Sequence, residues 1–163
     1  MCLLLCLFVV TGCEEDFDPV GSYTGDVHET AFVETSEVEL GDNPSVDNRT
    51  FRNNDDRSGV RVSVRNHVER RFEVVLDTGC VLSMRQAQAN PRSAEVDLSQ
   101  QEPCPIDVQG YSGPVLPQGS ARFGRDTRGL ELTLSGIQHD EADMDGFEGR
   151  TADVAWSYTF NTR

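Results

Sequence analysis

Residues 152–160 read Ala-Asp-Val-Ala-Trp-Ser-Tyr-Thr-Phe, with an apolar side chain at every second position. Successive side chains of a β-strand point to opposite sides, so a period of two predicts a strand with one buried face. Aromatic residues dominate this face, which is typical of strands that pack on a core. The expected core face consists of Ala152, Val154, Trp156, Tyr158 and Phe160.

The same period of two recurs through most of the chain, and no window of about a dozen residues shows the 3.6-residue period of a helix. Clusters of turn-forming residues separate the alternating runs, among them residues 53–59 and 77–79. Short strands with tight connections predict an all-β fold, an antiparallel up-and-down meander of about eight strands that closes into a small barrel. A two-sheet β-sandwich is the alternative. The alternating runs cover residues 60–65, 72–77, 94–98 and 130–135.

The N-terminal residues 2–10 form an apolar run that is far shorter than the roughly 20 residues needed to cross a bilayer as a helix. Such a run is typical of an export signal. The sequence that ends it, Val10-Thr11-Gly12-Cys13, resembles the lipobox of bacterial lipoproteins. In that family the cysteine thiol receives a diacylglyceryl group, and a peptidase cuts just before it. The resemblance implies a signal peptide over residues 1–12, a lipidated Cys13, and a protein anchored to a membrane of the bacterial cell envelope.

The residues after Cys13 are acidic and polar, so we expect residues 13–20 to form a lipidated tether and residues 21–163 to form a single barrel domain. Two or three acyl chains on the cysteine would anchor the protein stably without spanning the membrane. The net charge is −14, and such a domain is repelled by phosphate backbones and anionic headgroups. The composition therefore argues against nucleic-acid binding and against a second, electrostatic membrane contact.

Besides Cys13, the expected mature chain contains the cysteines Cys80 and Cys104. Exported proteins enter oxidising compartments, where such a pair is expected to form a disulfide. The bond would close a loop of about 25 residues and stabilise the fold by about 3.5 kcal/mol. Metal ligation or redox catalysis is the alternative, although the pair lacks a C-x-x-C spacing and a nearby histidine.

Residues 18–25, Asp-Pro-Val-Gly-Ser-Tyr-Thr-Gly, open the expected domain and resemble the start of lipocalin-like barrels. Tyr23 stands where the tryptophan of that family's G-x-W motif would be. The order of later features is similar to that of small bacterial lipoproteins with lipocalin-like domains. The resemblance implies a pocket for a small apolar molecule or lipid, or a stable barrel used as a surface module. We expect Tyr23, Trp156 and Tyr158 to line or plug such a pocket.

The segment Asp77-Thr78-Gly79, which follows a valine-rich run, resembles the D-T-G motif of retropepsin-like aspartic proteases. Those enzymes need two carboxylates that share a proton, so one motif per chain would demand a homodimer. Cys80 follows where a small residue is usual, and Asp-Thr-Gly also suits a hairpin turn. We expect a turn here, with catalysis through Asp77 as a remote alternative.

Acidic residues alternate between His139 and Gly146, as at the start of a calcium loop. A complete loop that begins at Glu141 would need a glutamate where Ala152 stands. The segment therefore predicts a solvated loop, or a weak calcium site made by Glu141, Asp143 and Asp145. We expect no other metal or cofactor.

The sequence contains neither a G-x-S-x-G elbow nor a glycine-rich phosphate loop after a strand, so it favours a protein without catalytic activity. The leading expectation is a membrane-anchored lipoprotein that binds a small apolar molecule or lipid inside its barrel. A structural or protein-interaction module of the envelope is the alternative.

Overall fold

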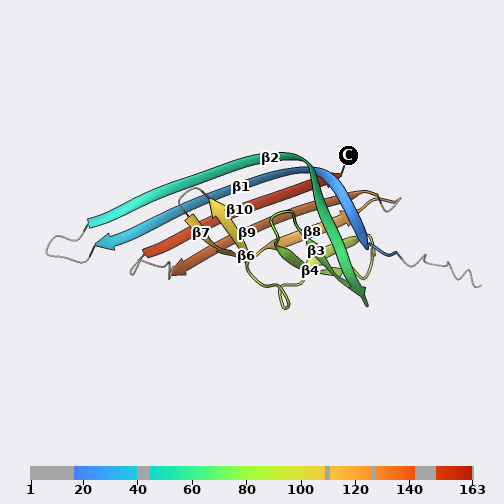
Figure 1. Cartoon of the computed structure of the whole chain (residues 1–163). Coiled ribbons are helices and arrows are strands. Elements are labelled where there is room, and N and C mark those ends of the chain that lie inside the picture. Colours follow the sequence, from blue (N-terminus) through green and yellow to red (C-terminus); the bar gives the residue numbers. More distant parts are fainter. Residues whose placement is uncertain (1–16, 40–44, 109–110, 126–127, 142–149, 163) are drawn as a thin grey trace, which may run out of the picture.

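Figure 1 shows the chain as a computed structural model, which describes residues 17–39, 45–108, 111–125, 128–141 and 150–162. These residues form β-strands and connections, with no α-helix among them. The strands are β1 (Gly21–Glu39), β2 (Ser45–Val68), β3 (Arg71–Val75), β4 (Val81–Gln86), β5 (Ser93–Val96), β6 (Cys104–Val108), β7 (Tyr111–Val115), β8 (Gln118–Phe123), β9 (Leu130–Glu141) and β10 (Arg150–Thr162).

Eight of these strands close an antiparallel barrel in the order β1-β10-β9-β8-β5-β4-β3-β2. Most neighbours in the barrel are also neighbours in sequence, and β10 pairs with β1 to complete the ring. The step from β5 to β8 is the exception, because β6 and β7 form a separate hairpin between them. The prediction of an all-β, up-and-down barrel of about eight strands is therefore confirmed, and its form is consistent with a small lipocalin-like barrel.

The last strand has the buried face that its alternation predicts. Val154, Trp156, Tyr158 and Phe160 are at most 4% exposed, whereas the side chains between them are exposed or half-buried. The side chain of Ala152 lies outside the described residues. Burying a large apolar side chain stabilises a fold by about 1.5–3 kcal/mol, so this face is a major part of the core.

Strand β2 differs from the sequence-based expectation, because it runs unbroken for 24 residues. The prediction of a turn at residues 53–59 is wrong, since these residues pair with β1 along the middle of the strand. The pairing register shifts at Gly25 and Asp26, opposite Gly59, whose φ is +70°. Gly59 is thus the extra residue of a β-bulge, a position that favours glycine because other residues rarely adopt a positive φ.

Aromatic side chains close one end of the barrel. The ring of Phe123 lies 5.2 Å from Phe17, 6.0 Å from Tyr23 and 5.6 Å from Phe72. The Tyr23 hydroxyl donates a hydrogen bond to the carbonyl of Pro19 at 2.8 Å. The residues directly before β1 therefore lie at this closed end of the barrel.

The β6–β7 hairpin covers the inner side of the long strands (Figure 1). Val115 is fully buried and lies so close to Gly136 of β9 that an added Cβ at this glycine would clash with it. A disulfide between Cys80 and Cys104, as predicted, ties the start of the hairpin to the start of β4, with the two Cα atoms 5.2 Å apart. The hairpin therefore adds its own apolar side chains to the barrel core.

Candidate functional site

Three residues singled out in the sequence, Asp77, Trp156 and Tyr158, are brought together around Arg57. The Tyr158 hydroxyl donates to Asp77 Oδ1 at 2.7 Å, and Arg57 Nε donates to Asp77 Oδ2 at 3.0 Å. Arg57 Nη2 donates to Glu29 Oε2 at 2.9 Å, and Trp156 Nε1 donates to Glu29 Oε1 at 2.8 Å. We call this set, together with Asp55, which also pairs with Arg57, the Arg57 cluster.

Strand register explains why these side chains meet. Glu29 of β1 lies directly opposite Asp55 of β2 on one side and Tyr158 of β10 on the other. Arg57 lies two residues beyond Asp55 and therefore faces the same side of the sheet. Asp77 arrives from a different part of the barrel, in the connection from β3 to β4. Sequence reasoning missed Arg57 because it assigned residues 53–59 to a turn. It placed Glu29 in the first strand but had no sign that β1 and β2 pair so as to bring Glu29 to Arg57.

The Arg57 cluster holds one cation among three carboxylates. Burial alone would lower the pKa of Arg57, but its hydrogen bonds to Glu29 and Asp55 and the charge of Asp77 raise it above its ordinary value. Burial and the hydrogen bond to Asp77 raise the pKa of Tyr158 well above its ordinary value. Both groups therefore stay protonated donors at neutral pH, and the cluster acts as a fixed cross-link among β1, β2, β10 and the β3–β4 connection.

The Asp-Thr-Gly segment forms the predicted turn. Gly79 N donates to the Leu76 carbonyl at 3.1 Å, Leu76 N donates to the Cys80 carbonyl at 2.9 Å, and Gly79 has a φ of +86°. An aspartic protease sets a second aspartate against the first, whereas here the guanidinium of Arg57 lies against Asp77. The geometry favours a structural role for Asp77.

Other residues proposed from the sequence lie apart from the Arg57 cluster. Tyr23 belongs to the aromatic closed end, whereas Trp156 and Tyr158 belong to the Arg57 cluster. Glu141 is the last residue of β9, but its side chain is not described. Asp143, Asp145 and Cys13, the predicted lipidation site, lie outside the described residues. Within the described part of the chain, no group of three or more histidine, cysteine, aspartate or glutamate side chains is placed to hold a metal ion.

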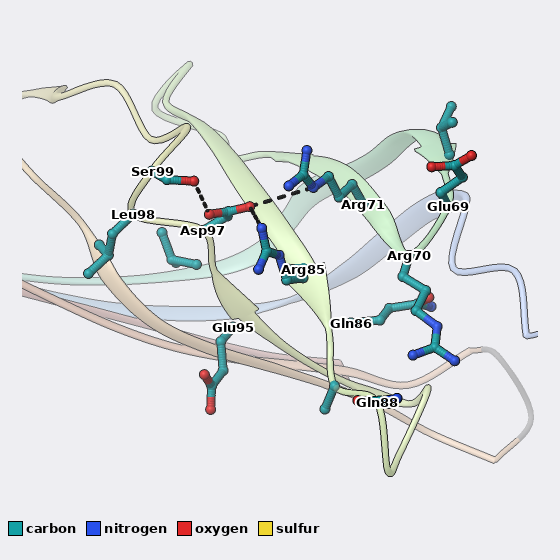
Figure 2. Close-up of a pocket in the computed structure, with 13 residues that line it drawn as sticks. Glu69, Arg70, Arg71, Arg85, Gln86, Gln88, Glu95, Asp97, Leu98 and Ser99 are labelled. Atoms are coloured by element: carbon teal, nitrogen blue, oxygen red, sulfur yellow. Dashed lines mark hydrogen bonds and ion pairs between the residues drawn. The ribbon is translucent and has the colours of Figure 1, made fainter.

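A second site lies on the outside of the barrel, where a cavity of about 1080 Å³ opens beside β3, β4 and the segment after β5 (Figure 2). Arg71 and Arg85 lie directly opposite each other in the strand register, and both converge on one oxygen of Asp97. Arg85 Nη2 is 3.0 Å and Arg71 Nε is 3.6 Å from Asp97 Oδ2. We call these three residues the twin-arginine site.

Asp97 is held firmly in the twin-arginine site. Its carboxylate is 8% exposed and accepts a hydrogen bond from the Ser99 hydroxyl at 2.6 Å. Its backbone N–H donates to the Ser83 carbonyl at 2.7 Å. The hydrogen bond from Ser99, followed by the charge of Arg85, lowers the pKa of Asp97 below its ordinary value. Asp97 is therefore a stable anion at neutral pH, and it fixes where both guanidinium groups lie.

The rim of the cavity includes a strained turn. Glu69 and Arg70 connect β2 to β3 with φ values of +49° and +72°. Two positive φ values are the geometry of a type I′ hairpin turn, which prefers asparagine and glycine. Other residues in this region cost about 1–2 kcal/mol each. A hydrogen bond of 2.8 Å from Gln86 N to the Arg70 carbonyl holds the turn, so Arg70 is fixed at the rim.

Sequence reasoning missed the twin-arginine site, although one signal pointed to it. Once the turn at Asp77-Thr78-Gly79 is recognised, a hairpin centred on Thr78 pairs Val75 with Val81 and Arg71 with Arg85, as observed. The position of Asp97 carried no comparable signal, because it depends on the connection that follows β5.

Comparison of the chain with known protein families and with curated proteins finds no match. In the part of the chain that the structure describes, no helix has the length and apolar character needed to span a bilayer.

Proposed function

We propose that this protein is a lipid-anchored binding module of the bacterial cell envelope, without catalytic activity, and that it binds its ligand on the outside of the barrel. The N-terminal sequence Val10-Thr11-Gly12-Cys13 supports the anchor. The closed barrel with a buried apolar core supports a stable module.

We place the ligand outside the barrel because side chains occupy the barrel interior. Large side chains from many strands are fully buried there, including Leu82, Met84, Leu132, Tyr158 and Phe160. The β6–β7 hairpin adds further apolar side chains on the inner side. The cavity beside the twin-arginine site instead opens to solvent, with Arg71 and Arg85 each more than half exposed. A ligand could reach this surface without displacing any part of the core.

Native mass spectrometry of the mature chain tests this proposal against the expectation of an apolar ligand inside the barrel. The protein would be purified from the envelope in a neutral detergent and released from it in the gas phase. We expect the mass of the lipidated chain alone. A tightly held extra mass of a few hundred daltons that persists in an Arg71→Gln/Arg85→Gln variant and is lost only on denaturation would instead identify an interior ligand.

Labelling of cells with tritiated palmitate tests the anchor. The full chain should take up label and sediment with membranes, whereas a Cys13→Ser variant should do neither. A Cys80→Ser/Cys104→Ser variant is the matched control, because it also loses cysteines but should keep the label. Equal labelling of the Cys13→Ser variant and the parent would overturn the lipoprotein proposal.

A further inference from the structure

The twin-arginine site has an excess of positive charge within an acidic protein. Arg71 and Arg85 are paired directly across β3 and β4, an arrangement that is unfavourable for like charges. One carboxylate, Asp97, lies between them, so the three groups together keep one positive charge. The carboxylate of Glu95, which lies opposite Arg85 in register, points away from the pair in Figure 2. Glu69 and Glu95 also line the cavity, so the excess of positive charge belongs to the twin-arginine site and not to the whole lining.

The two guanidinium groups also keep unused donors. Each carries five N–H groups, and the ion pairs with Asp97 use Nη2 of Arg85 and Nε of Arg71. No other hydrogen bond joins either side chain to the described residues, and the two side chains are 53% and 55% exposed. Guanidinium groups match the oxygens of a phosphate in pairs, so two fixed ones form a preorganised phosphate site.

The surroundings of the site point to a phosphate that carries an apolar group. Val68 and Leu98 line the same cavity and are 66% and 56% exposed. Glu69 and Arg70 of the strained turn also line the cavity, and in Figure 2 both side chains point away from Arg71 and Arg85. Exposed apolar side chains beside arginines suit the short apolar part of a phosphate ester.

We propose that the twin-arginine site binds the phosphate group of an amphiphilic phosphate ester, with Arg71 and Arg85 on the phosphate oxygens and Val68 and Leu98 against the apolar part. This inference names the ligand of the proposed surface site and rests on that proposed function.

Two sources of such a phosphate fit the position of the site. Asp18, at the start of the domain, contacts His67 at 3.2 Å, one residue before Val68. If Cys13 carries lipid, the chain from Cys13 to Phe17 spans at most about 14 Å, so a phospholipid headgroup of the anchoring membrane is within reach. The net charge of −14 repels an anionic membrane as a whole, so this contact would depend on the local charge of Arg71 and Arg85. A soluble phosphate ester is the other source.

The test measures binding to two phosphate probes, with the mature chain in neutral maltoside micelles. Isothermal titration with hexyl phosphate and with inorganic phosphate compares the parent with an Arg71→Gln/Arg85→Gln variant. The matched control is Arg65→Gln/Arg122→Gln, which removes the same charge from exposed positions elsewhere on the barrel. We expect the parent and the control to bind hexyl phosphate alike, and the Arg71→Gln/Arg85→Gln variant to bind it at least 10-fold more weakly.

A second variant separates the apolar contact from the charge. Val68→Ser/Leu98→Ser should weaken the binding of hexyl phosphate severalfold and leave that of inorganic phosphate unchanged. Both altered pairs are exposed in the fold, so each variant should unfold at nearly the parent temperature, which is checked by circular dichroism. Equal binding by the parent and the Arg71→Gln/Arg85→Gln variant, or no binding by the parent, would overturn the inference.

The source of the phosphate is decided with vesicles. A Cys13→Ser chain, which has no lipid of its own, is sedimented with vesicles of phosphatidylglycerol in phosphatidylcholine. Sedimentation that depends on Arg71 and Arg85 assigns the site to a headgroup, whereas titration with hexyl phosphate but no sedimentation assigns it to a soluble ester. Failure of palmitate labelling would remove the anchor but not the binding of hexyl phosphate, so the two proposals fail separately.

Discussion

The molecule contains two clusters of arginine and carboxylate with opposite proportions. The Arg57 cluster sets one guanidinium among three carboxylates, and its charged side chains are half-buried: Arg57 is 28%, Asp77 21%, Glu29 14% and Asp55 42% exposed. The twin-arginine site sets two guanidinium groups against one carboxylate, and both arginines are more than half exposed. The first arrangement uses the donors of its arginine within the protein. The second leaves donors facing solvent, so one cluster serves the fold and the other is available to a ligand.

Removing the disulfide should destabilise the protein most, because Cys80 directly follows the turn that places Asp77 in the Arg57 cluster. A Cys80→Ser/Cys104→Ser variant loses a loop constraint, and we expect the free energy of unfolding to fall by about 3.5 kcal/mol. Urea unfolding followed by tryptophan fluorescence measures the change, since Trp156 lies in the cluster. A decrease in the free energy of unfolding of less than about 1 kcal/mol would show that the turn stays in place without the disulfide.

Replacing the central cation should cost nearly as much. An Arg57→Ala variant leaves Glu29, Asp55 and Asp77 close together without a cation. Removing one partner of a fully buried ion pair costs about 3–5 kcal/mol, so this half-buried site should lose about 2–3 kcal/mol. Arg57→Lys keeps the charge but cannot present the planar fork of donors, so it should lie between the parent and Arg57→Ala. Unfolding in urea ranks the three proteins. Equal stability of the alanine and lysine variants would show that the charge of Arg57 is not what holds the cluster.

The hydroxyl of Tyr158 makes a smaller and pH-dependent contribution. Tyr158→Phe removes its hydrogen bond to Asp77 and should cost about 1 kcal/mol at neutral pH. The folded protein holds the pKa of Tyr158 above its ordinary value, so the unfolded chain loses this proton first. The stabilising effect is complete below pH 10, and as pH rises further it should disappear at about 1.4 kcal/mol per pH unit.

The measurement that checks this is the slope of unfolding free energy against pH, from pH 9 to 11.5, in the parent and in Tyr158→Phe. Tyr23, whose pKa is also raised by burial and by Asp18, contributes to both proteins and cancels in the difference. Parallel slopes would mean that Tyr158 ionises equally easily in the folded and unfolded chains.

The two clusters also differ in how far the sequence predicts them. Period-two alternation predicts the barrel and the buried positions of Trp156 and Tyr158, because the sequence of each strand alone shows which of its faces is apolar. It does not predict that Glu29 faces the same side of the sheet as Tyr158 and contacts Arg57, because that contact depends on which strands become neighbours. The polar residues 53–59 resemble a turn, and only the long partner strand β1 makes them part of β2. Cross-strand pairing, rather than local preference, therefore decides both sites.

Substitutions in the twin-arginine site should change the free energy of unfolding least. Arg85→Gln removes one ion pair with Asp97, but it also relieves the repulsion between Arg85 and Arg71. Asp97 is only 8% exposed, but it keeps Arg71 and the Ser99 hydroxyl as partners when Arg85 is removed. The two effects should therefore nearly cancel and leave the free energy of unfolding within about 0.5 kcal/mol of the parent. Arg65→Gln, which breaks the exposed pair of Arg65 with Glu73, is the matched control.

Urea unfolding of Arg85→Gln, Arg65→Gln and Arg57→Ala under the same conditions compares their free energies of unfolding directly. A loss above about 2 kcal/mol in Arg85→Gln alone would mean that the fold depends on this pair of arginines as it does on Arg57. The arginines would then be needed to hold the segment after β5 in place, and their exposed donors would no longer argue for a ligand. A neutral Arg85→Gln beside a strongly destabilised Arg57→Ala would instead mean that the charge excess has no structural purpose, which leaves binding as the reason for two like charges placed side by side.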